Sequence, residues 1–462
     1  MKKTANKWLQ HAILLAAPLL TVIDVFIVNI AIPSIKENIH ATDAQIELII
    51  AAYLVGYASF MITGSRAGDF WGRKKVFMWG MLFFVLTSCI CGMAQSPLLL
   101  IIARFFQGVS GAFMTPQALS YVQILFPEAK ERTKAIGWVG LTLGIASLLG
   151  QFLGGYFAGL QSFMAGWRFI FFINLPLGCI ALAATYAYVV ETKINSQSSF
   201  DYWGVLLLAL SLSSIILPLT EGRELGWPWW SFILLGIGVF LFIVFVKYQE
   251  KRTKNNQNPL VNSQLFRIRS FNIGIMMASC YFMMHTSFYL MSTIYLQNGL
   301  HIASYDTGML FVYSGVLFML SSLVSIKLVT RFGKLPVQIG LLLMMLSLVL
   351  QGTYFTDAVH PMVLKLIISL SGLAGGLVLP SLINFVLRGI PQQFVGTASG
   401  VYNTIQQIAS SFGICLIAGF FFYLIAQGNS IPFAYHYALY AQLVCLGIVL
   451  MLSFFYKKNI NE

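Results

Sequence analysis

Charged side chains are scarce in this chain of 462 residues. Asp, Glu, Lys and Arg together make up 9% of it, and only 15 residues are acidic. Soluble domains carry roughly 25% charged residues. Hydrophobic residues make up 58% of the chain, which is more apolar surface than a soluble protein of this length can bury, whereas a membrane protein exposes such surface to lipid. The composition therefore argues against a soluble protein.

Several patterns that carry chemistry are also missing from the sequence. It contains no nucleotide-binding loop, metal-ligand cluster or nucleophile–base arrangement, so we expect no enzyme, no ATP-driven pump, no metal and no cofactor. All six cysteines lie in apolar segments, which argues against a disulfide framework. Cys89 and Cys91 have no His or Cys partner nearby, and we interpret them as helix-packing residues.

Long apolar runs are present instead. A membrane-spanning helix needs about 20 mostly apolar residues. Fourteen segments meet this requirement, and they predict an all-α polytopic membrane protein with these spans: 9–33, 45–64, 76–95, 98–120, 135–159, 167–190, 203–219, 229–247, 272–297, 304–327, 337–356, 361–385, 398–427 and 434–456.

The basic residues predict how the chain is oriented. Loops on the cytoplasmic side of a membrane are enriched in Lys and Arg. The net charge is +13, and with the N-terminus inside, the basic residues lie on the inner side except for these five: Lys36, Arg168, Arg223 and Lys365 outside, and Arg104 within a span. This asymmetry explains the positive charge without a nucleic-acid partner. It predicts a multi-pass protein of the cell (plasma or inner) membrane with both termini cytoplasmic, including the basic pair Lys457-Lys458. The basic N-terminus leads into the first span without a small-residue cleavage site, which is typical of an uncleaved signal anchor.

An internal repeat predicts the domain organisation. The pattern Gly108-x-x-Gly111-x-x-x-x-Pro116 in the fourth span recurs 264 residues later, and so do Pro127 and Thr133 after it, as Gly372, Gly375, Pro380, Pro391 and Thr397. Internal repeats of this kind are common in transporters. We expect two six-helix bundles at 1–192 and 272–462, an inserted helix pair at 193–250 and a cytoplasmic linker at 251–271.

Asp24 and Arg104 are ionisable residues inside predicted spans. A carboxylate near the middle of a membrane costs about 2.5–3.5 kcal/mol on insertion scales, so it is rarely kept without a use. At 1.5 Å per residue, both side chains lie roughly 10–13 Å below the outer surface, which allows a direct or water-mediated pair. Burial disfavours the charged carboxylate and a nearby guanidinium favours it. Two interpretations follow: coupling to a proton or a substrate, or a static ion pair that braces two helices.

Glu47 and His285 are secondary candidates for proton chemistry. Glu47 lies near the outer end of the second span, where we expect a solvated side chain more than a second proton site. His285 lies inside the ninth span and corresponds by the repeat to Thr21, one turn before Asp24. An imidazole titrates near neutral pH, but a packing role is the simpler interpretation.

Two further segments are rich in glycine. We expect the loop after the second span to control gating, with Asp69 accepting hydrogen bonds from a helix N-terminus; its candidate residues are Gly68, Asp69, Gly72, Arg73 and Lys74. The fifth span has a glycine face on which another helix can approach closely and slide. Close static packing is the alternative for this face, which contains Gly140, Gly144, Gly150, Gly154 and Gly155.

These motifs together resemble the major facilitator superfamily, specifically its fourteen-helix drug:proton antiporter branch, over nearly the whole chain. Six motifs in order carry the resemblance: Asp24 to Pro33, Gly68 to Lys74, Ala103 to Gly108, Gly150 to Gly155, Trp167 to Gly178 and Glu221 to Pro228. The chain departs from the family pattern at Gln151, where the antiporter motif usually has Pro, and at Ser65, Ala67 and Phe70 in the gating segment.

The resemblance implies the major facilitator fold, in which two six-helix bundles alternate access to a substrate near the membrane midplane. It implies proton-coupled efflux of a lipophilic or cationic small molecule, with the proton gradient as the energy source. Asp24 would accept the proton or cation, and Arg104 would be its partner. A uniporter or importer of a metabolite is the alternative, because Gln151 replaces the antiporter proline. We expect a monomer in the lipid bilayer.

Overall fold

The structure, a computed structural model, describes residues 6–160, 162, 164–192, 201–255, 257, 259–356, 360–387, 390 and 395–455. Helices account for the regular structure in these ranges, which contain no strand beyond a single bridge residue. Fourteen of the described helical segments are long and apolar enough to cross a membrane. The predicted all-α polytopic fold is confirmed. Pro391 of the repeat and Lys457-Lys458 lie outside the described residues.

The chain forms two compact units, Met1–Asn262 and Ser263–Glu462. The helices of the first unit are α1 (Lys7–Leu14), α2 (Ala16–Asn38), α3 (Asp43–Trp71), α4 (Arg73–Met93), α5 (Pro97–Leu125), α6 (Ala129–Ala158), α7 (Phe169–Phe172), α8 (Asn174–Tyr188), α9 (Tyr202–Leu217) and α10 (Trp229–Lys254). The helices of the second unit are α11 (Arg269–Ile294), α12 (Ser304–Phe332), α13 (Leu335–Tyr354), α14 (Pro361–Leu387), α15 (Val395–Phe412), α16 (Gly419–Ala426) and α17 (Ile431–Phe455).

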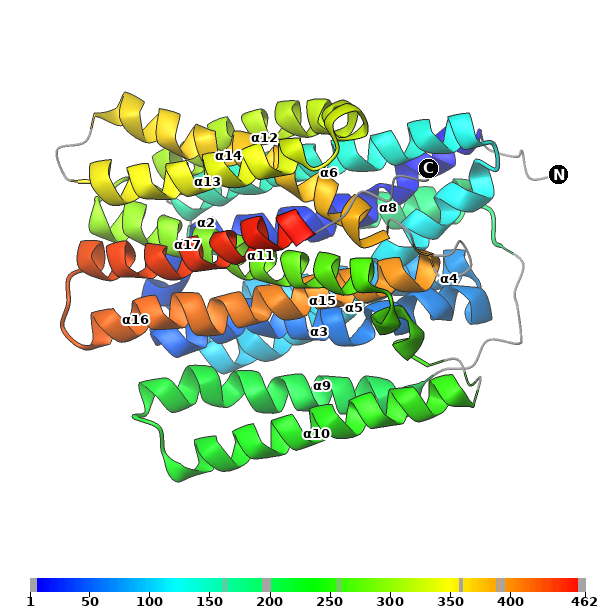
Figure 1. Ribbon diagram of the computed structural model, residues 1–462, viewed down its shortest axis with the longest axis horizontal. Coiled ribbons are helices and arrows are strands. Elements are labelled where there is room, and N and C mark those ends of the chain that lie inside the picture. The colour runs from blue at the N-terminus through cyan, green and yellow to red at the C-terminus, as the bar shows by residue number, and fades with distance from the viewer. Residues whose placement is uncertain are drawn as a thin grey trace. The chain divides into compact units, whose positions relative to one another are not determined.

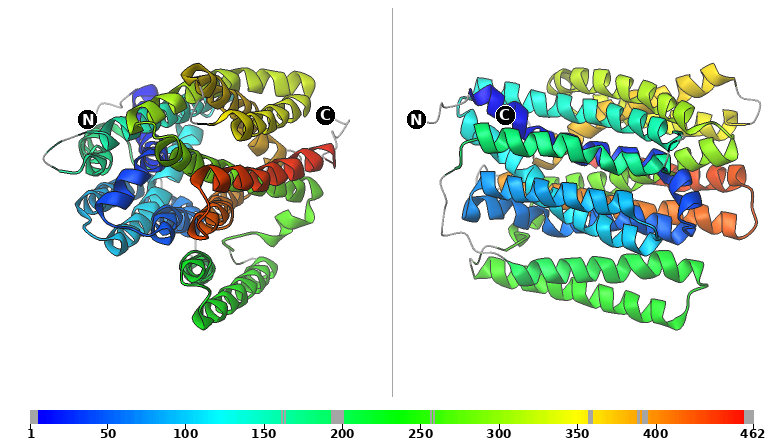
Figure 2. Two further views of the ribbon diagram at one scale, coloured as in Figure 1. Left: turned by 90° about the vertical axis from the view of Figure 1, so that its left-hand side faces the viewer. Right: turned by 180° about the vertical axis from the view of Figure 1, so that it is seen from behind.

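The inserted pair α9 and α10 belongs to the first unit, where α9 packs against α3 (Figure 1). The two helices run side by side (Figure 2), and α9 continues into a π-helical turn at Pro218–Gly222 before residues 223–228 lead to α10. The boundary between the compact units, at Asn262 and Ser263, falls inside the predicted linker 251–271. The predicted domain limits themselves stay a prediction.

The segment between the second and third spans is almost entirely helical, so the expected loop there is wrong. A capping box formed by Thr42 and Gln45 starts α3, and this helix continues to Trp71. Gly72 alone separates it from α4, with φ at +94°, a conformation that glycine adopts without steric cost. Gly68 and Asp69 therefore lie on the last turn of α3, and Arg73 and Lys74 on the first turn of α4.

The repeated glycines make the same kind of helix contact in both units. A Cβ atom on Gly108 of α5 would lie 2.1 Å from the Tyr53 carbonyl oxygen of α3. A Cβ atom on Gly372 of α14 would lie 1.9 Å from the Ser314 carbonyl oxygen of α12. Only glycine allows backbones to approach this closely. The repeat found in the sequence therefore marks equivalent contacts, α3 with α5 and α12 with α14.

Candidate functional site

Asp24 and Arg104 form a direct ion pair between α2 and α5. Arg104 Nη1 donates to Asp24 Oδ2. The Asp24 side chain is fully buried, and the Arg104 side chain is 2% exposed. The sequence predicts that the two side chains lie at the same depth, and in the structure they are in direct contact in the interior of the first unit. A buried pair of this kind is strongly coupled, because removing either partner leaves the other charge without compensation.

Gln107 joins both members of this pair. It lies one turn after Arg104 on α5, and its Oε1 accepts a 2.8 Å hydrogen bond from Arg104 Nη1. Its Nε2 donates to Asp24 Oδ1 at 2.8 Å. Each carboxylate oxygen of Asp24 thus has its own donor. Hydrogen bonds to charged groups contribute roughly 1.5–3 kcal/mol each, so Gln107 fixes the geometry of the pair.

A second layer of polar side chains extends this network. Asn174 Nδ2, at the start of α8, approaches Asp24 Oδ1 at 3.4 Å and donates to Ser88 Oγ on α4 at 2.9 Å. Ser88 Oγ in turn donates to the Phe171 carbonyl oxygen at 2.9 Å. In the described part of the chain the Asn174 Oδ1 atom has no partner. A buried acceptor without a donor is costly, so this atom marks where the network can accept a further hydrogen bond.

Arg104 also has partners that do not carry charge. Its Nε donates to the Ile49 carbonyl oxygen at 3.4 Å. Its guanidinium lies over the Tyr53 ring, with Cζ 4.3 Å from the ring centroid. Such cation–π contacts contribute about 2 kcal/mol when they are desolvated. Arg104 therefore keeps several contacts that are independent of Asp24.

Glu47 is buried rather than solvated, which corrects the expectation from the sequence. Its side chain is fully buried, and Arg223 Nη2 donates to Glu47 Oε1 at 2.5 Å. The neighbouring Glu224 Oε2 accepts the Ala44 N–H at 2.8 Å. The physical reason is tertiary: the inserted pair covers this end of α3 and brings Arg223 to it. Glu47 Oε2 and Arg223 Nη1 are buried without hydrogen-bond partners among the described residues.

His285 lies in an aromatic cluster of the second unit. Its ring stacks on Tyr281 at 5.6 Å between centroids and meets Tyr289 edge-on at 5.1 Å. The Phe282 ring also meets the His285 ring edge-on, with 6.2 Å between the ring centroids. Because Tyr281, His285 and Tyr289 are spaced four residues apart on α11, they share one helix face. Among the described residues, the contacts of the imidazole are with aromatic rings and include no carboxylate.

Asp69 pairs with Arg73 at 2.5 Å instead of capping a helix, so that part of the expectation is wrong. The N-terminus of α4 is capped by Glu191. The Glu191 carboxylate accepts the backbone N–H groups of Lys74 at 2.9 Å and Lys75 at 3.1 Å. Its carboxyl atoms would also lie within 2.7–2.9 Å of a Cβ on Gly72. Negative charge at a helix N-terminus is favourable, and Glu191 supplies it from the end of the sixth span.

The glycine face of α6 packs against α2 within the first unit, and its assignment to motion between bundles stays a prediction. A Cβ on Gly150 would lie 2.9 Å from the Ile23 carbonyl oxygen, and one on Gly154 would lie 2.7 Å from that of Ile27. Both contacts are with α2, the helix that carries Asp24. Gly144 and Gly155 are buried, but Gly140 is exposed and a Cβ there would meet no atom within 4 Å.

Four residues of the site were not singled out from the sequence: Ser88, Gln107, Asn174 and Glu191. Gln107 carried a usable signal, since side chains three residues apart on a helix are neighbours and Arg104 precedes it by three. Asn174 is an uncharged polar residue inside an apolar run. No metal-ligating cluster of His, Cys, Asp or Glu is found among the described residues.

Curated proteins similar to this chain are named as transport and resistance proteins. The "Probable actinorhodin transporter" of Streptomyces coelicolor is 28% identical over 427 residues, which cover 92% of this chain and 74% of that protein. The "Puromycin resistance protein pur8" of Streptomyces alboniger is 28% identical over 421 residues, which cover 89% of this chain and 81% of that protein.

Solved structures and a family profile agree with this relationship. A crystal structure described as a D-xylose-proton symporter superposes with a TM-score of 0.69 at 13% identity, covering 99% of both chains. That likeness shows the fold. The profile described as Major Facilitator Superfamily matches residues 14–201 and 201–414. The chain is a multi-pass membrane protein with fourteen candidate spans, and it belongs to the Major Facilitator Superfamily.

Proposed function

We propose that this chain is a secondary active exporter that moves lipophilic or cationic small molecules out of the cell by alternating access, driven by the proton gradient. It acts in the cell membrane with both termini cytoplasmic, as a monomer and without a bound cofactor. The observation that carries the proposal is the buried Asp24–Arg104 pair with Gln107 between its two members.

The network supports exchange of a proton at Asp24. A proton on Asp24 removes the negative charge and with it the ion pair. Arg104 then retains the Gln107 Oε1 atom, the Ile49 carbonyl oxygen and the face of the Tyr53 ring. The remaining contacts lower the cost of an uncompensated buried charge, which otherwise reaches 3–5 kcal/mol. The ion pair can therefore open without loss of the fold. A static ion pair that only braces two helices would not need these additional contacts to Arg104.

The similar proteins support the substrate class. One is named as a probable transporter of actinorhodin and another as a puromycin resistance protein. Both names point to organic small molecules, and the spans around Asp24 are strongly apolar. The first experiment therefore uses two probes of this class.

Transport by purified protein in liposomes tests the proposal. Ethidium, a lipophilic cation, and puromycin serve as probes, and uptake into inside-out vesicles is measured with and without an imposed pH gradient, interior acidic. We expect the gradient to increase uptake of at least one probe by tenfold or more in the wild type, and to have no effect in the Asp24→Asn variant. Equal uptake with and without the gradient contradicts proton coupling.

An importer or uniporter with the same fold is the second candidate, and Gln151 favours it. This residue replaces the proline of the antiporter motif; it is buried, and its Nε2 donates to Ser147 Oγ at 3.3 Å. The same vesicles distinguish the candidates. Protons flow outward from the acidic interior, so an importer driven by protons carries its substrate outward with them, and the gradient lowers uptake. A uniporter shows no response to the gradient in either direction.

A further inference from the structure

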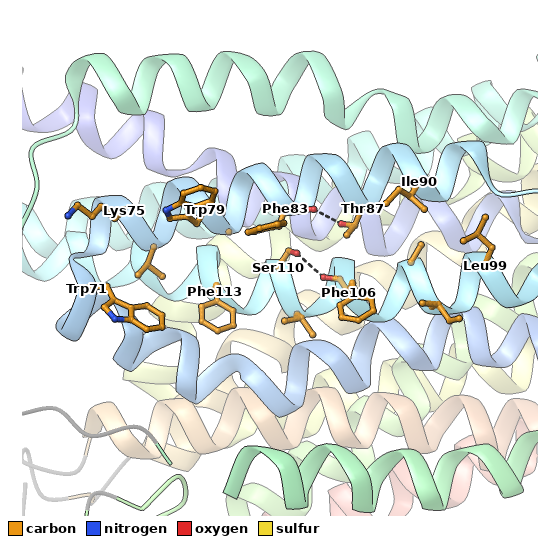
Figure 3. Close-up of a pocket in the computed structure, with 15 residues that line it drawn as sticks. Trp71, Lys75, Trp79, Phe83, Thr87, Ile90, Leu99, Phe106, Ser110 and Phe113 are labelled. Atoms are coloured by element: carbon orange, nitrogen blue, oxygen red, sulfur yellow. Dashed lines mark hydrogen bonds between the residues drawn. The ribbon is translucent and has the colours of Figure 1, made fainter. Parts of the chain in front are cut away.

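An apolar groove runs along the outside of the first unit between α4 and α5, with Trp71 of α3 at one end (Figure 3). It encloses about 930 Å³, near the upper end of the roughly 300–1,000 Å³ range of ligand pockets. Its walls carry large exposed side chains: Trp79 is 60% exposed and Phe106 is 53% exposed. The groove thus has the size of a binding site, and its walls are exposed on the outside of the unit.

The groove is long enough for a lipid acyl chain, and the small residues on its floor leave room for one. It follows α4 from Lys75 to Ile90 (Figure 3), a distance of roughly 22 Å at 1.5 Å per residue. One leaflet of the hydrocarbon core is roughly half of 30 Å deep. Small residues form the floor, among them Gly80, Ala103 and Ser110. An acyl chain that enters beside Lys75 therefore fits along the full depth of its leaflet.

Lys75 places an unpaired positive charge at the mouth of this groove. Of the three basic residues that open α4, Arg73 pairs with Asp69, and Lys74 Nζ donates to the Tyr186 carbonyl oxygen at 2.9 Å. The ammonium group of Lys75 is exposed and has no ion pair or hydrogen bond among the described residues. Two tryptophans, Trp71 and Trp79, flank it, as aromatic residues do at the level of lipid headgroups.

We propose that this groove binds a phospholipid with an anionic headgroup, which pairs with Lys75 while its acyl chains run between α4 and α5. Basic pockets between membrane helices on the cytoplasmic side bind anionic lipid headgroups. The charge decides between occupants: Lys75 repels a lipophilic cation, and it gains less from a headgroup without net charge than from an anionic one. This site is separate from Asp24 and does not depend on the direction of transport.

Native mass spectrometry of the full chain in detergent tests the proposal, with equimolar dioleoyl phosphatidylglycerol and dioleoyl phosphatidylcholine as probes. We expect the wild type to retain phosphatidylglycerol about fivefold over phosphatidylcholine, the fold-change that corresponds to about 1 kcal/mol for one basic residue near an anionic headgroup. Lys75→Gln is expected to reduce the ratio to about one. Lys251→Gln removes the same charge from an exposed site on α10 outside the groove and is expected to keep the preference.

A second pair of variants tests the groove itself. Thr87→Trp fills it, since Thr87 lines the groove and its hydroxyl bonds only to its own helix. Thr142→Trp is the matched control on α6, where the hydroxyl also bonds to its own helix, at the Trp138 carbonyl oxygen. Loss of the retained lipid in Thr87→Trp alone is expected. An equal ratio of the two lipids in the wild type, retention in Thr87→Trp, or displacement of the lipid by ethidium overturns the proposal.

Discussion

Gln107 and Arg104 act on Asp24 as one unit. Arg104 Nη1 donates both to Asp24 Oδ2 and, at 2.8 Å, to Gln107 Oε1. Gln107 Nε2 donates to the other oxygen of the same carboxylate, Asp24 Oδ1, at 2.8 Å. The closed ring of three side chains holds a buried charge pair in one arrangement. It also offers Arg104 a neutral acceptor when Asp24 is protonated.

Gln107→Leu is expected to weaken the ring without removing either charge. The variant loses two hydrogen bonds to charged groups, each of which contributes roughly 1.5–3 kcal/mol. We expect the free energy of unfolding, measured by denaturant titration in micelles, to fall by at least the contribution of one such bond. Ser110→Ala on the same helix loses only a bond to its own helix, at the Phe106 carbonyl oxygen, and is expected to change stability by less than about 0.5 kcal/mol. Equal losses for the two variants argue against a special role for Gln107.

Glu47 and Arg223 are expected to depend on one another. Either Glu47→Leu or Arg223→Leu leaves an uncompensated buried charge, at a cost of roughly 3–5 kcal/mol. The double variant removes both charges and is expected to recover most of that loss, because apolar replacement of a buried pair is often close to neutral. A double-mutant cycle on the free energy of unfolding measures the coupling. Additive losses would show that the pair does not join α3 to the inserted helices.

The cap on α4 is expected to depend on Glu191 rather than on Asp69. Glu191→Ala removes the acceptor of two backbone N–H groups, and the loss of a helix cap costs roughly 0.5–2 kcal/mol. Asp69→Ala removes an ion pair whose side chains are 41% and 21% exposed, and such pairs contribute about 0–1 kcal/mol. Thermal unfolding of both variants compares them. A larger loss in Asp69→Ala would restore Asp69 as the main anchor of this segment.

Gly154 is expected to tolerate no side chain. A Cβ there would lie 2.7 Å from the Ile27 carbonyl oxygen and 3.0 Å from Ile30 Cβ, and overpacking costs typically 1–3 kcal/mol. Gly154→Leu is therefore expected to separate α6 from α2 and lower thermal stability. Gly140→Leu is the control, since no atom lies within 4 Å of a Cβ at that position. Similar behaviour of the two variants would contradict close packing of α6 on α2.

Much of the fold was predictable because the membrane simplifies the physics. Backbone groups in lipid must be satisfied internally, so apolar runs of sufficient length become helices. The Asp24–Arg104 pair was predictable for a related reason: a charge inside a span requires a partner, and depth along a helix follows from residue counting.

Contacts made by the ends of helices were not predictable in this way. Glu47 and Arg223 are 176 residues apart, and the hydropathy pattern of α3 contains no information about what covers its end. Glu191 and Lys74 are 117 residues apart, so the cap on α4 was assigned to the nearer carboxylate, Asp69. The glycine face of α6 was recognised as a site of close approach, but its partner α2 depends on tertiary packing alone.

Proton exchange at Asp24 is tested most directly by proton movement. Purified protein is reconstituted in liposomes that contain a pH-sensitive dye, and ethidium or puromycin is supplied on one side with no imposed gradient. In the wild type we expect transport of the probe to move protons in the opposite direction, and in Asp24→Asn we expect no proton movement while the probe still binds. Proton movement of wild-type magnitude in Asp24→Asn would contradict the assignment of Asp24 as the proton acceptor.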